Sequence, residues 1–231
     1  MSRDGRHFFY VNPQEVWPLA NEKNPDRRHV QTKRQKWFGC ACCPPNIARL
    51  LSSLGKYVYS YGKHTLYVHL YIAGEARIKT GHGEFFVRQN GNYPWDGDIR
   101  LTLCSVPDAD SRIAVRIPGW CREFEIRQNG KKAECRVEKG YAYLENGIRA
   151  GDEIHLLFIM AAELIQANPK VRADAGKAAI QRGPVVYCLE EEDNGSNLSA
   201  IRLDTDCGLQ IAETVLPGGI PAITAKGYRT E

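Results

Sequence analysis

Short runs of strand-forming residues, separated by turn signals, fill the middle of this 231-residue chain. Residues 65–72 are rich in β-branched and aromatic side chains, and residues 99–103 alternate strictly between apolar and polar ones. The Asn129-Gly130 pair that follows residues 124–127 is typical of a two-residue hairpin turn. Such runs recur roughly every 8–15 residues, which predicts an antiparallel β-sandwich. Further strands are expected over residues 84–88, 113–117, 141–144, 153–159, 178–181 and 185–189.

This pattern divides the chain into three segments. Residues 1–62 hold a strand-like start, a polar stretch and one helix, and residues 63–163 form the sandwich. Residues 164–231 are typical of a second sandwich that is only partly present, with few strand signals after Cys207. A lone amphipathic helix needs a partner for its apolar face. We therefore expect the chain to be a fragment of a larger protein.

Three of the eight cysteines fall within four positions, at Cys40, Cys42 and Cys43, directly before Pro44 and Pro45. Adjacent cysteines rarely pair, because disulfide geometry does not suit neighbours. A packed core normally takes a single thiol among hydrocarbon side chains. The cluster therefore predicts a metal site, a reactive thiolate or both. The alternative is three ordinary thiols in a tight turn.

Apolar residues follow the cluster at helical spacing and predict a helix over residues 45–59. Proline is well tolerated at the first helical position, where Pro44 or Pro45 would stand. Cys42 and Cys43 then lie at the helix N-terminus, where orphan N–H groups and the helix dipole favour a thiolate. A thiolate is the form that attacks electrophiles and binds metals. The apolar positions are Ile47, Leu50, Leu51, Leu54 and Val58.

Composition excludes several classes of function. The formal net charge of +4 is small for this length and implies no polyanionic partner, so we expect no nucleic acid. The basic run over residues 27–36 and the acidic run over residues 190–193 are interpreted as solvated loops. No apolar stretch approaches the length of a membrane span, and no secretory signal is visible. Eight cysteines without a signal predict free thiols and a cytoplasmic location, although an exported parent whose signal lies outside this chain would have the same composition.

Several motifs resemble those of glycoside hydrolase family 127, the β-L-arabinofuranosidase family. They occur in family order and cover about residues 8–190. The resemblance implies a mainly β fold, in which antiparallel β-sandwich domains follow the last helical segment of an (α/α)6 barrel. The boundaries expected are 1–62 for the barrel remnant, 63–163 for sandwich I and 164–231 for part of sandwich II. The matching stretches are Phe9–Pro13, Gly39–Arg49, Asn92–Gly97, Arg116–Trp120, Gly151-Asp152 and Arg182–Glu190.

The resemblance also implies a zinc centre beside a sugar site. Carried onto this sequence, Cys42 is the nucleophile and Cys42 and Cys43 are zinc ligands. Tyr10 is a candidate for lining the sugar pocket, although a half-buried strand tyrosine is the simpler interpretation. The remaining zinc ligands, a glutamate and a cysteine, and the acid/base glutamate are expected upstream of this chain. The parent is thus expected to be a retaining glycosidase, and the isolated chain to be inactive.

The expected partner is an arabinose-containing oligosaccharide or glycoconjugate, with a homodimer left open. Two other functions are left open as well. A non-catalytic carbohydrate-binding or interaction module would use sandwich aromatics such as Tyr67, Tyr71, Trp95 and Trp120. Trp95 and Trp120 are better explained as caps of the sandwich core, because each adjoins proline and glycine turn residues. A redox or zinc-storage protein would use the cysteine cluster alone.

Overall fold

The computed structural model describes residues 2, 4–11, 15–40, 42–216 and 220–230. Strands outnumber helices among these residues, so the mainly β fold with several antiparallel sheets is confirmed. Contacts divide the chain into two compact units. The sandwich unit comprises Ser52–Ala161 with Arg182–Val185, and the second unit comprises Met1–Leu51, Ala162–Gln181 and Val186–Glu231. The partition into three domains stays a prediction.

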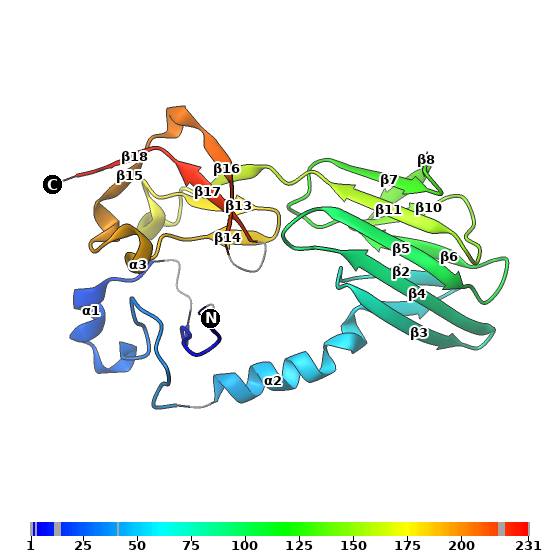
Figure 1. Ribbon diagram of the computed structural model, residues 1–231, viewed down its shortest axis with the longest axis horizontal. Helices are drawn as coiled ribbons and strands as arrows, with labels where there is room; N and C mark the ends of the chain where they lie inside the picture. The colour runs from blue at the N-terminus through cyan, green and yellow to red at the C-terminus, as the bar shows by residue number, and fades with distance from the viewer. Residues whose placement is uncertain (1, 3, 12–14, 41, 217–219, 231) are drawn as a thin grey trace. The chain divides into compact units, whose positions relative to one another are not determined.

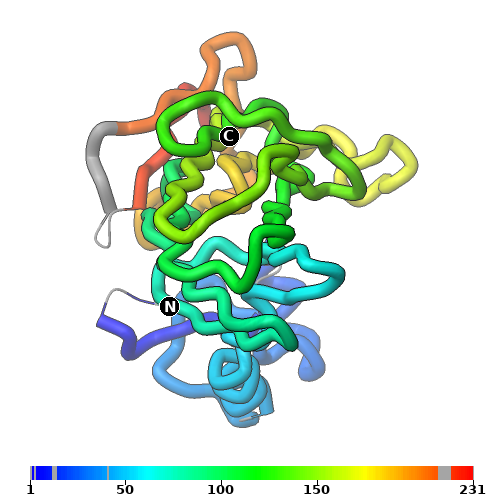
Figure 2. The backbone as a smooth tube through the Cα atoms, turned by 90° about the vertical axis from the view of Figure 1, so that its right-hand side faces the viewer, coloured from blue at the N-terminus to red at the C-terminus, as the bar shows by residue number. Residues whose placement is uncertain are grey.

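The sandwich unit is built from two sheets (Figure 1). The five-stranded sheet has the order β1 (Tyr59–Gly62), β2 (Thr65–Val68), β6 (Arg112–Arg116), β10 (Tyr141–Leu144) and β9 (Cys135–Glu138). The six-stranded sheet has the order β3 (Gly74–Thr80), β4 (Gly83–Gly91), β5 (Asp98–Ser105), β11 (Glu153–Phe158), β7 (Phe124–Gln128) and β8 (Lys131–Lys132). Neighbouring strands are antiparallel in the pairs described, except that β2 and β6 run parallel. The path of the backbone through both sheets can be followed in Figure 2.

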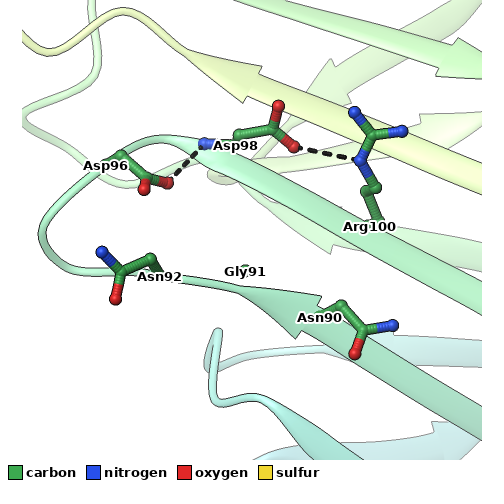
Figure 3. Close-up of a pocket in the computed structure, with 6 residues that line it drawn as sticks. All are labelled: Asn90, Gly91, Asn92, Asp96, Asp98 and Arg100. Atoms are coloured by element: carbon green, nitrogen blue, oxygen red, sulfur yellow. Dashed lines mark hydrogen bonds and ion pairs between the residues drawn. The ribbon is translucent and has the colours of Figure 1, made fainter.

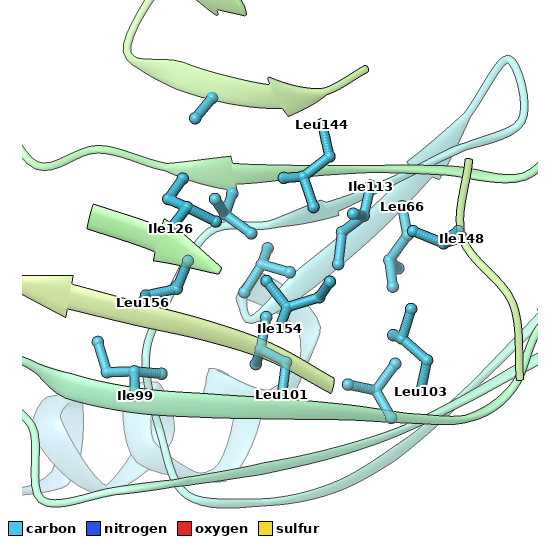
Figure 4. Packing of buried hydrophobic residues seen from close by; sticks show 14 of the residues in the cluster. Leu66, Ile99, Leu101, Leu103, Ile113, Ile126, Leu144, Ile148, Ile154 and Leu156 are labelled. Atoms are coloured by element: carbon cyan, nitrogen blue, oxygen red, sulfur yellow. The ribbon is translucent and has the colours of Figure 1, made fainter. Parts of the chain in front are cut away.

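The core of the sandwich lies between these two sheets (Figure 4). On β5 the buried residues are Ile99, Leu101 and Leu103, every second position, as strict alternation predicts. Leu66 of β2 and Ile113 of β6 face them from the other sheet and are fully buried. Each such side chain stabilises the fold by about 1.5–3 kcal/mol when it leaves water. Hydrophobic burial at period two therefore fixes which face of each strand points inward.

The loop before β11 is held by one carboxylate, that of Asp152. It accepts hydrogen bonds from the side chains of Gln128 and Asn129, both at 2.8 Å, and from the backbone N–H of Arg149 at 2.9 Å. Partial burial raises the pKa of Asp152. The hydrogen bonds and the positive charge of Arg149 together lower this pKa by more than burial raises it, so the net pKa lies below the ordinary value. The folded state therefore prefers Asp152 in its ionised form.

We expect this preference to make the sandwich unit less stable in acid. Because the pKa of Asp152 is lower when folded, its stabilising effect is present above the unfolded pKa and is lost as pH falls through the folded pKa. In the Asp152→Asn variant, the urea midpoint should fall less between neutral and acidic pH than in the wild type. An equal acid-induced fall in both proteins would contradict the assignment.

The second unit contains short helices and small sheets. A three-stranded sheet has the order β12–β13–β14, and two two-stranded sheets pair β15 with β18 and β16 with β17. Helix α2 (Cys43–Ser53) begins in this unit and ends at the first residues of the sandwich unit. The 3-10 helix η2 (Leu54–Tyr57) follows it. The other bounds are α1 (Pro18–Glu22), η1 (Pro25–Arg27), β12 (Ala162–Ile165), η3 (Arg172–Asp174), β13 (Ala179–Arg182), β14 (Val185–Tyr187), α3 (Glu191–Asn194), η4 (Leu198–Ala200), β15 (Ile201–Leu203), η5 (Thr205–Cys207), β16 (Leu209–Leu216), β17 (Ile220–Ala225) and β18 (Gly227–Arg229).

Near the N-terminus and the predicted helix, two expectations differ from the structure. The strand expected near residues 7–12 is only an isolated bridge between Phe8 and Gln35, although Asn12 lies outside the described residues. The helix expected over 45–59 begins at Cys43 and ends its regular part at Ser53. Tyr59 already belongs to β1, because pairing with β2 outweighs the helical spacing of the apolar residues.

Towards the C-terminus, two further expectations differ. The acidic run is not a loop, because residues 191–194 form α3, where carboxylates in the first turn suit the helix dipole. The tail after Cys207 is richer in strands than expected, since β16, β17 and β18 all lie there. No helix among the described residues is long and apolar enough to cross a membrane.

Candidate catalytic thiol site

An aromatic cluster positions the segment that carries Tyr10. Phe8 and Gln35 exchange two backbone hydrogen bonds of 2.9 and 3.0 Å. The buried ring of Phe38 then packs against Phe8 at 5.2 Å and against Tyr10 at 5.3 Å between ring centroids. The backbone bridge and the ring contacts together hold Tyr10 next to the chain that leads into the cysteine cluster.

The cysteines lie where that chain enters α2. Cys43 is the first helical residue, and Cys42 directly precedes it, as predicted. The carbonyl of Cys42 accepts the backbone N–H of Asn46 at 3.4 Å, which is the first hydrogen bond of the helix. Pro44 and Pro45 follow Cys43 and carry no N–H. The helix end therefore offers the Cys42 sulfur fewer N–H donors than an ordinary helix N-terminus.

The structure brings together the three residues that the sequence singled out. The sulfur of Cys42 lies 2.8 Å from the hydroxyl of Tyr10 and 3.8 Å from the sulfur of Cys43. The sulfur of Cys40 lies 3.4 Å from that of Cys42, so Cys40 belongs to the same cluster. Cys42 is exposed, as a group that attacks a substrate must be.

The neighbours of Cys42 shift the pKa of its thiol in opposite directions. The hydrogen bond with Tyr10 lowers the pKa of the Cys42 thiol, whereas the thiols of Cys40 and Cys43 raise it, and the net pKa is above the ordinary value. The three cysteines in turn raise the pKa of Tyr10, which stays a hydrogen-bond donor. The expected thiolate is therefore not favoured by the protein alone, because the hydrogen bonds with the two neighbouring sulfurs stabilise the neutral thiol of Cys42.

The cysteine pair offers part of a zinc site. A tetrahedral zinc with Zn–S bonds of about 2.3 Å separates its sulfurs by about 3.8 Å, and the sulfurs of Cys42 and Cys43 are 3.8 Å apart. Within the described residues, no group of three or more His, Cys, Asp and Glu side chains is arranged to hold a metal ion. The pair thus fits zinc in donor type and spacing, and further ligands would have to join it.

Two contacts at this site are not visible in sequence patterns. His29 lies edge-on to Tyr10, with 5.9 Å between ring centroids. Arg34 forms a two-bond ion pair with Glu190, at 2.5 and 2.6 Å, and also lies 5.1 Å above the ring of Phe9. Both charged groups are only about a quarter exposed, so neither belongs to a freely solvated loop as expected. The charge signs alone could have suggested the pair, but 156 positions separate the two residues.

The remaining sequence candidates lie elsewhere. Trp120 packs against the sandwich core, with its ring 6.0 Å from that of Phe158, so its predicted role as a core cap is confirmed. Trp95 and Asp96 lie in the turn between β4 and β5. All eight cysteines are described, and all are free thiols.

Comparison with known proteins places this site in a family. Residues 1–56 match the model of the β-L-arabinofuranosidase GH127 catalytic domain, and this range includes Tyr10, Cys42 and Cys43. Residues 65–160 match the GH127 middle domain, and residues 162–224 match the family 127 C-terminal domain. The chain belongs to glycoside hydrolase family 127. The family resemblance is thereby confirmed over nearly the whole chain.

Relatives of known structure and activity support the family 127 assignment. A non-reducing end β-L-arabinofuranosidase of Bifidobacterium longum subsp. longum is 43% identical over 241 residues, which cover 99% of this chain and 36% of the relative. The crystal structure of a GH127 β-L-arabinofuranosidase from Geobacillus stearothermophilus T6 matches with a TM-score of 0.81 and 42% identity, over 98% of this chain and 40% of that one. A GH127 β-arabinofuranosidase matches with a TM-score of 0.77 and 30% identity, over 97% and 38%. The chain thus spans little more than a third of the relatives it matches.

Proposed function

We propose that this chain supplies the thiol side of the active site of a retaining glycoside hydrolase that releases β-L-arabinofuranose or a related sugar. Cys42 is the nucleophile. One observation carries this proposal: an exposed sulfur at the start of α2 lies 2.8 Å from a tyrosine hydroxyl, within the range matched by the GH127 catalytic-domain model. The substrate class is inferred from the Bifidobacterium relative, a non-reducing end β-L-arabinofuranosidase.

The reaction would proceed by two displacements at the anomeric carbon. The Cys42 sulfur attacks, a C–S bond forms as the glycosidic C–O bond breaks, and the leaving oxygen takes a proton from a general acid. Water then attacks the same carbon, its proton returns to that acid/base group, and the C–S bond breaks. Two inversions give net retention, as with a carboxylate nucleophile. A thiolate can replace the carboxylate if its charge is stabilised.

Tyr10 would orient the nucleophile. Its hydroxyl is held beside Cys42 by the packing of its ring on Phe38, and its hydrogen bond favours the thiolate form of Cys42. A donor of fixed position also aims one lone pair of the sulfur and leaves the others for the substrate. This makes Tyr10 a positioning residue at the candidate site.

Zinc would be held by Cys42 and Cys43 and, when bound, would supply positive charge that favours the thiolate. Because the neighbouring sulfurs raise the pKa of Cys42, such a positive charge would be needed to favour the thiolate. The general acid would be the glutamate that the family resemblance assigns to a part of the enzyme this chain does not cover, since the chain spans 36% of the Bifidobacterium relative. We therefore expect the 231-residue chain alone not to hydrolyse glycosides.

The function is tested by a hybrid enzyme. This chain replaces the matching 36% of the Bifidobacterium relative, and release of the aryl group from an aryl β-L-arabinofuranoside is measured. Turnover by the hybrid, without turnover by this chain alone, is the expected result. A folded hybrid that lacks turnover would contradict the proposal, and turnover by this chain alone would contradict the need for an external acid.

The ligand pair can be tested on the chain by itself with cobalt(II), a spectroscopic substitute for zinc. We expect a thiolate-to-cobalt charge-transfer band that is lost in the Cys42→Ala/Cys43→Ala variant, because soft thiolates are the donors. The Cys188→Ala/Cys207→Ala variant, which also removes two exposed thiols, serves as the matched control and should keep the band. A band that survives only in the first variant would assign the metal to other cysteines.

A further inference from the structure

The sandwich unit carries an open pocket of about 390 Å³ at the end of the β4–β5 hairpin, and most of the residues that line it have polar or charged side chains. This volume is within the range of small-molecule sites. The turn of the hairpin is Asn92–Gly97, one of the stretches that carry the family resemblance, and the thiol chemistry leaves it without a role. Figure 3 shows the lining residues, which are Asn90, Gly91 and Asn92 at the end of β4 and Asp96, Asp98 and Arg100 on the turn and the start of β5.

The frame of the pocket is fixed by backbone contacts. The carbonyl of Asn92 accepts the N–H of Trp95 at 2.9 Å, and the carbonyl of Trp95 accepts a hydrogen bond from Arg182 at 2.6 Å. Gly97 packs so closely on β11 that a Cβ there would lie 2.1 Å from the carbonyl oxygen of Phe158. Only glycine fits at that position. The backbone of the turn is therefore held in place without help from a ligand.

The side chains of the pocket keep unused hydrogen-bonding capacity. The amides of Asn90 and Asn92 make no hydrogen bond within the described part of the chain. Asp96 accepts the backbone N–H of Asp98 with its Oδ1 atom. The described contacts of the Asp98 side chain also use Oδ1, which lies 3.3 Å from Nε of Arg100 and 3.1 Å from Nε2 of His155. Two amides and two carboxylate Oδ2 atoms are thus free to bind. This set contains both donors and acceptors.

We propose that this pocket binds a sugar unit of the glycan, outside the reacting bond. Each sugar hydroxyl both donates and accepts, which is the complement of paired amides and carboxylates. An anion is disfavoured by the two carboxylates, and a cation by the guanidinium of Arg100 beside Asp98. The described residues also offer no group of three acidic, His or Cys side chains arranged for a metal. The glycan, its reacting bond and the identity of the sugar, arabinofuranose, rest on the proposed function.

The test is an NMR titration of the ¹⁵N-labelled 231-residue chain with methyl β-L-arabinofuranoside. We expect the side-chain NH₂ signals of Asn90 and Asn92 to shift with a dissociation constant of about 1 mM, as suits a small open site. Asn92→Ala should weaken binding about fivefold to tenfold, since it removes one or two net hydrogen bonds. The matched control is Thr102→Ala, on the same strand as Arg100 but outside the pocket lining, and it should bind as the wild type does.

The outcomes separate this inference from the proposed function. Shifts confined to Tyr10 and the cysteine cluster would overturn the pocket and leave the thiol site supported. If the NMR signals of the pocket still shift in the Cys42→Ala variant of the chain, the pocket is supported. If the hybrid enzyme is also inactive, the proposed function is contradicted while the pocket stands. Shifts of the same NH₂ signals with calcium chloride and not with the sugar would assign a cation site and overturn the proposal, as would the absence of any shift at these amides.

Discussion

Replacing Cys42 by alanine is expected to lower the turnover of the hybrid enzyme by about 10⁴-fold or more, because loss of a covalent nucleophile leaves only binding and acid catalysis. Aryl arabinofuranosides report this directly, since release of the aryl group is the first chemical step. The KM should change much less than kcat. Tyr10→Phe, which removes only the hydroxyl that lies 2.8 Å from Cys42, should have a smaller effect on kcat.

Two controls make this result specific. Cys188→Ala removes another thiol of the same unit, and it should leave turnover within about twofold, as substitutions outside a site usually do. Cys42→Ala must also keep the unfolding transition of the parent hybrid. If Cys42→Ala retained a tenth or more of the activity, Cys42 would not be the nucleophile, and another group would have to carry the covalent step.

The second large effect concerns the sandwich core. Phe85→Ala is expected to destabilise the sandwich by about 3–5 kcal/mol, because the Phe85 side chain is fully buried and its loss leaves a cavity. The next residue, Phe86, provides a matched control. It points to the other face of β4, is only half-buried and lies under the guanidinium of Arg77 at 3.9 Å, so Phe86→Ala should cost about 1 kcal/mol.

Urea denaturation followed by tryptophan fluorescence measures both variants. The ratio of the two effects tests the register of β4, since a shift by one residue would exchange the two faces. Equal losses for Phe85→Ala and Phe86→Ala would contradict the register given by the pairing of β4 with β5.

The sequence sufficed for features that depend on local patterns. Strict alternation located β5, and the spacing of Ile47, Leu50 and Leu51 located α2. The cysteine spacing and the family motifs also point to Cys42 and Cys43, whose roles as nucleophile and zinc ligands stay a prediction. For β5 and α2 the signal lies within about a dozen neighbouring residues, so the local pattern is enough to distinguish a strand from a helix.

Other features depend on partners far along the chain and could not be predicted. β1 forms over Tyr59–Gly62 because β2 is available to pair with it, although the apolar spacing continues the helix. The pairing of Arg34 with Glu190 joins two runs that each look like solvated loops by themselves. The raised pKa of Cys42 arises from how the sulfurs of Cys40 and Cys43 are placed around it, and the sequence order alone does not give those distances.

The parallel pairing of β2 with β6 bears on how the sandwich is made during synthesis. In this pairing Leu66 of β2 aligns with Ile113 of β6. Because β3, β4 and β5 come between β2 and β6 in the chain, the hairpin of β1 and β2 cannot pair with β6 until the ribosome has synthesised all three strands. Closing so long a loop is slow and favours late, concerted assembly over hairpin-by-hairpin folding. A nascent chain arrested before Arg112 should consequently remain open to protease, and one arrested beyond Phe158 should resist it.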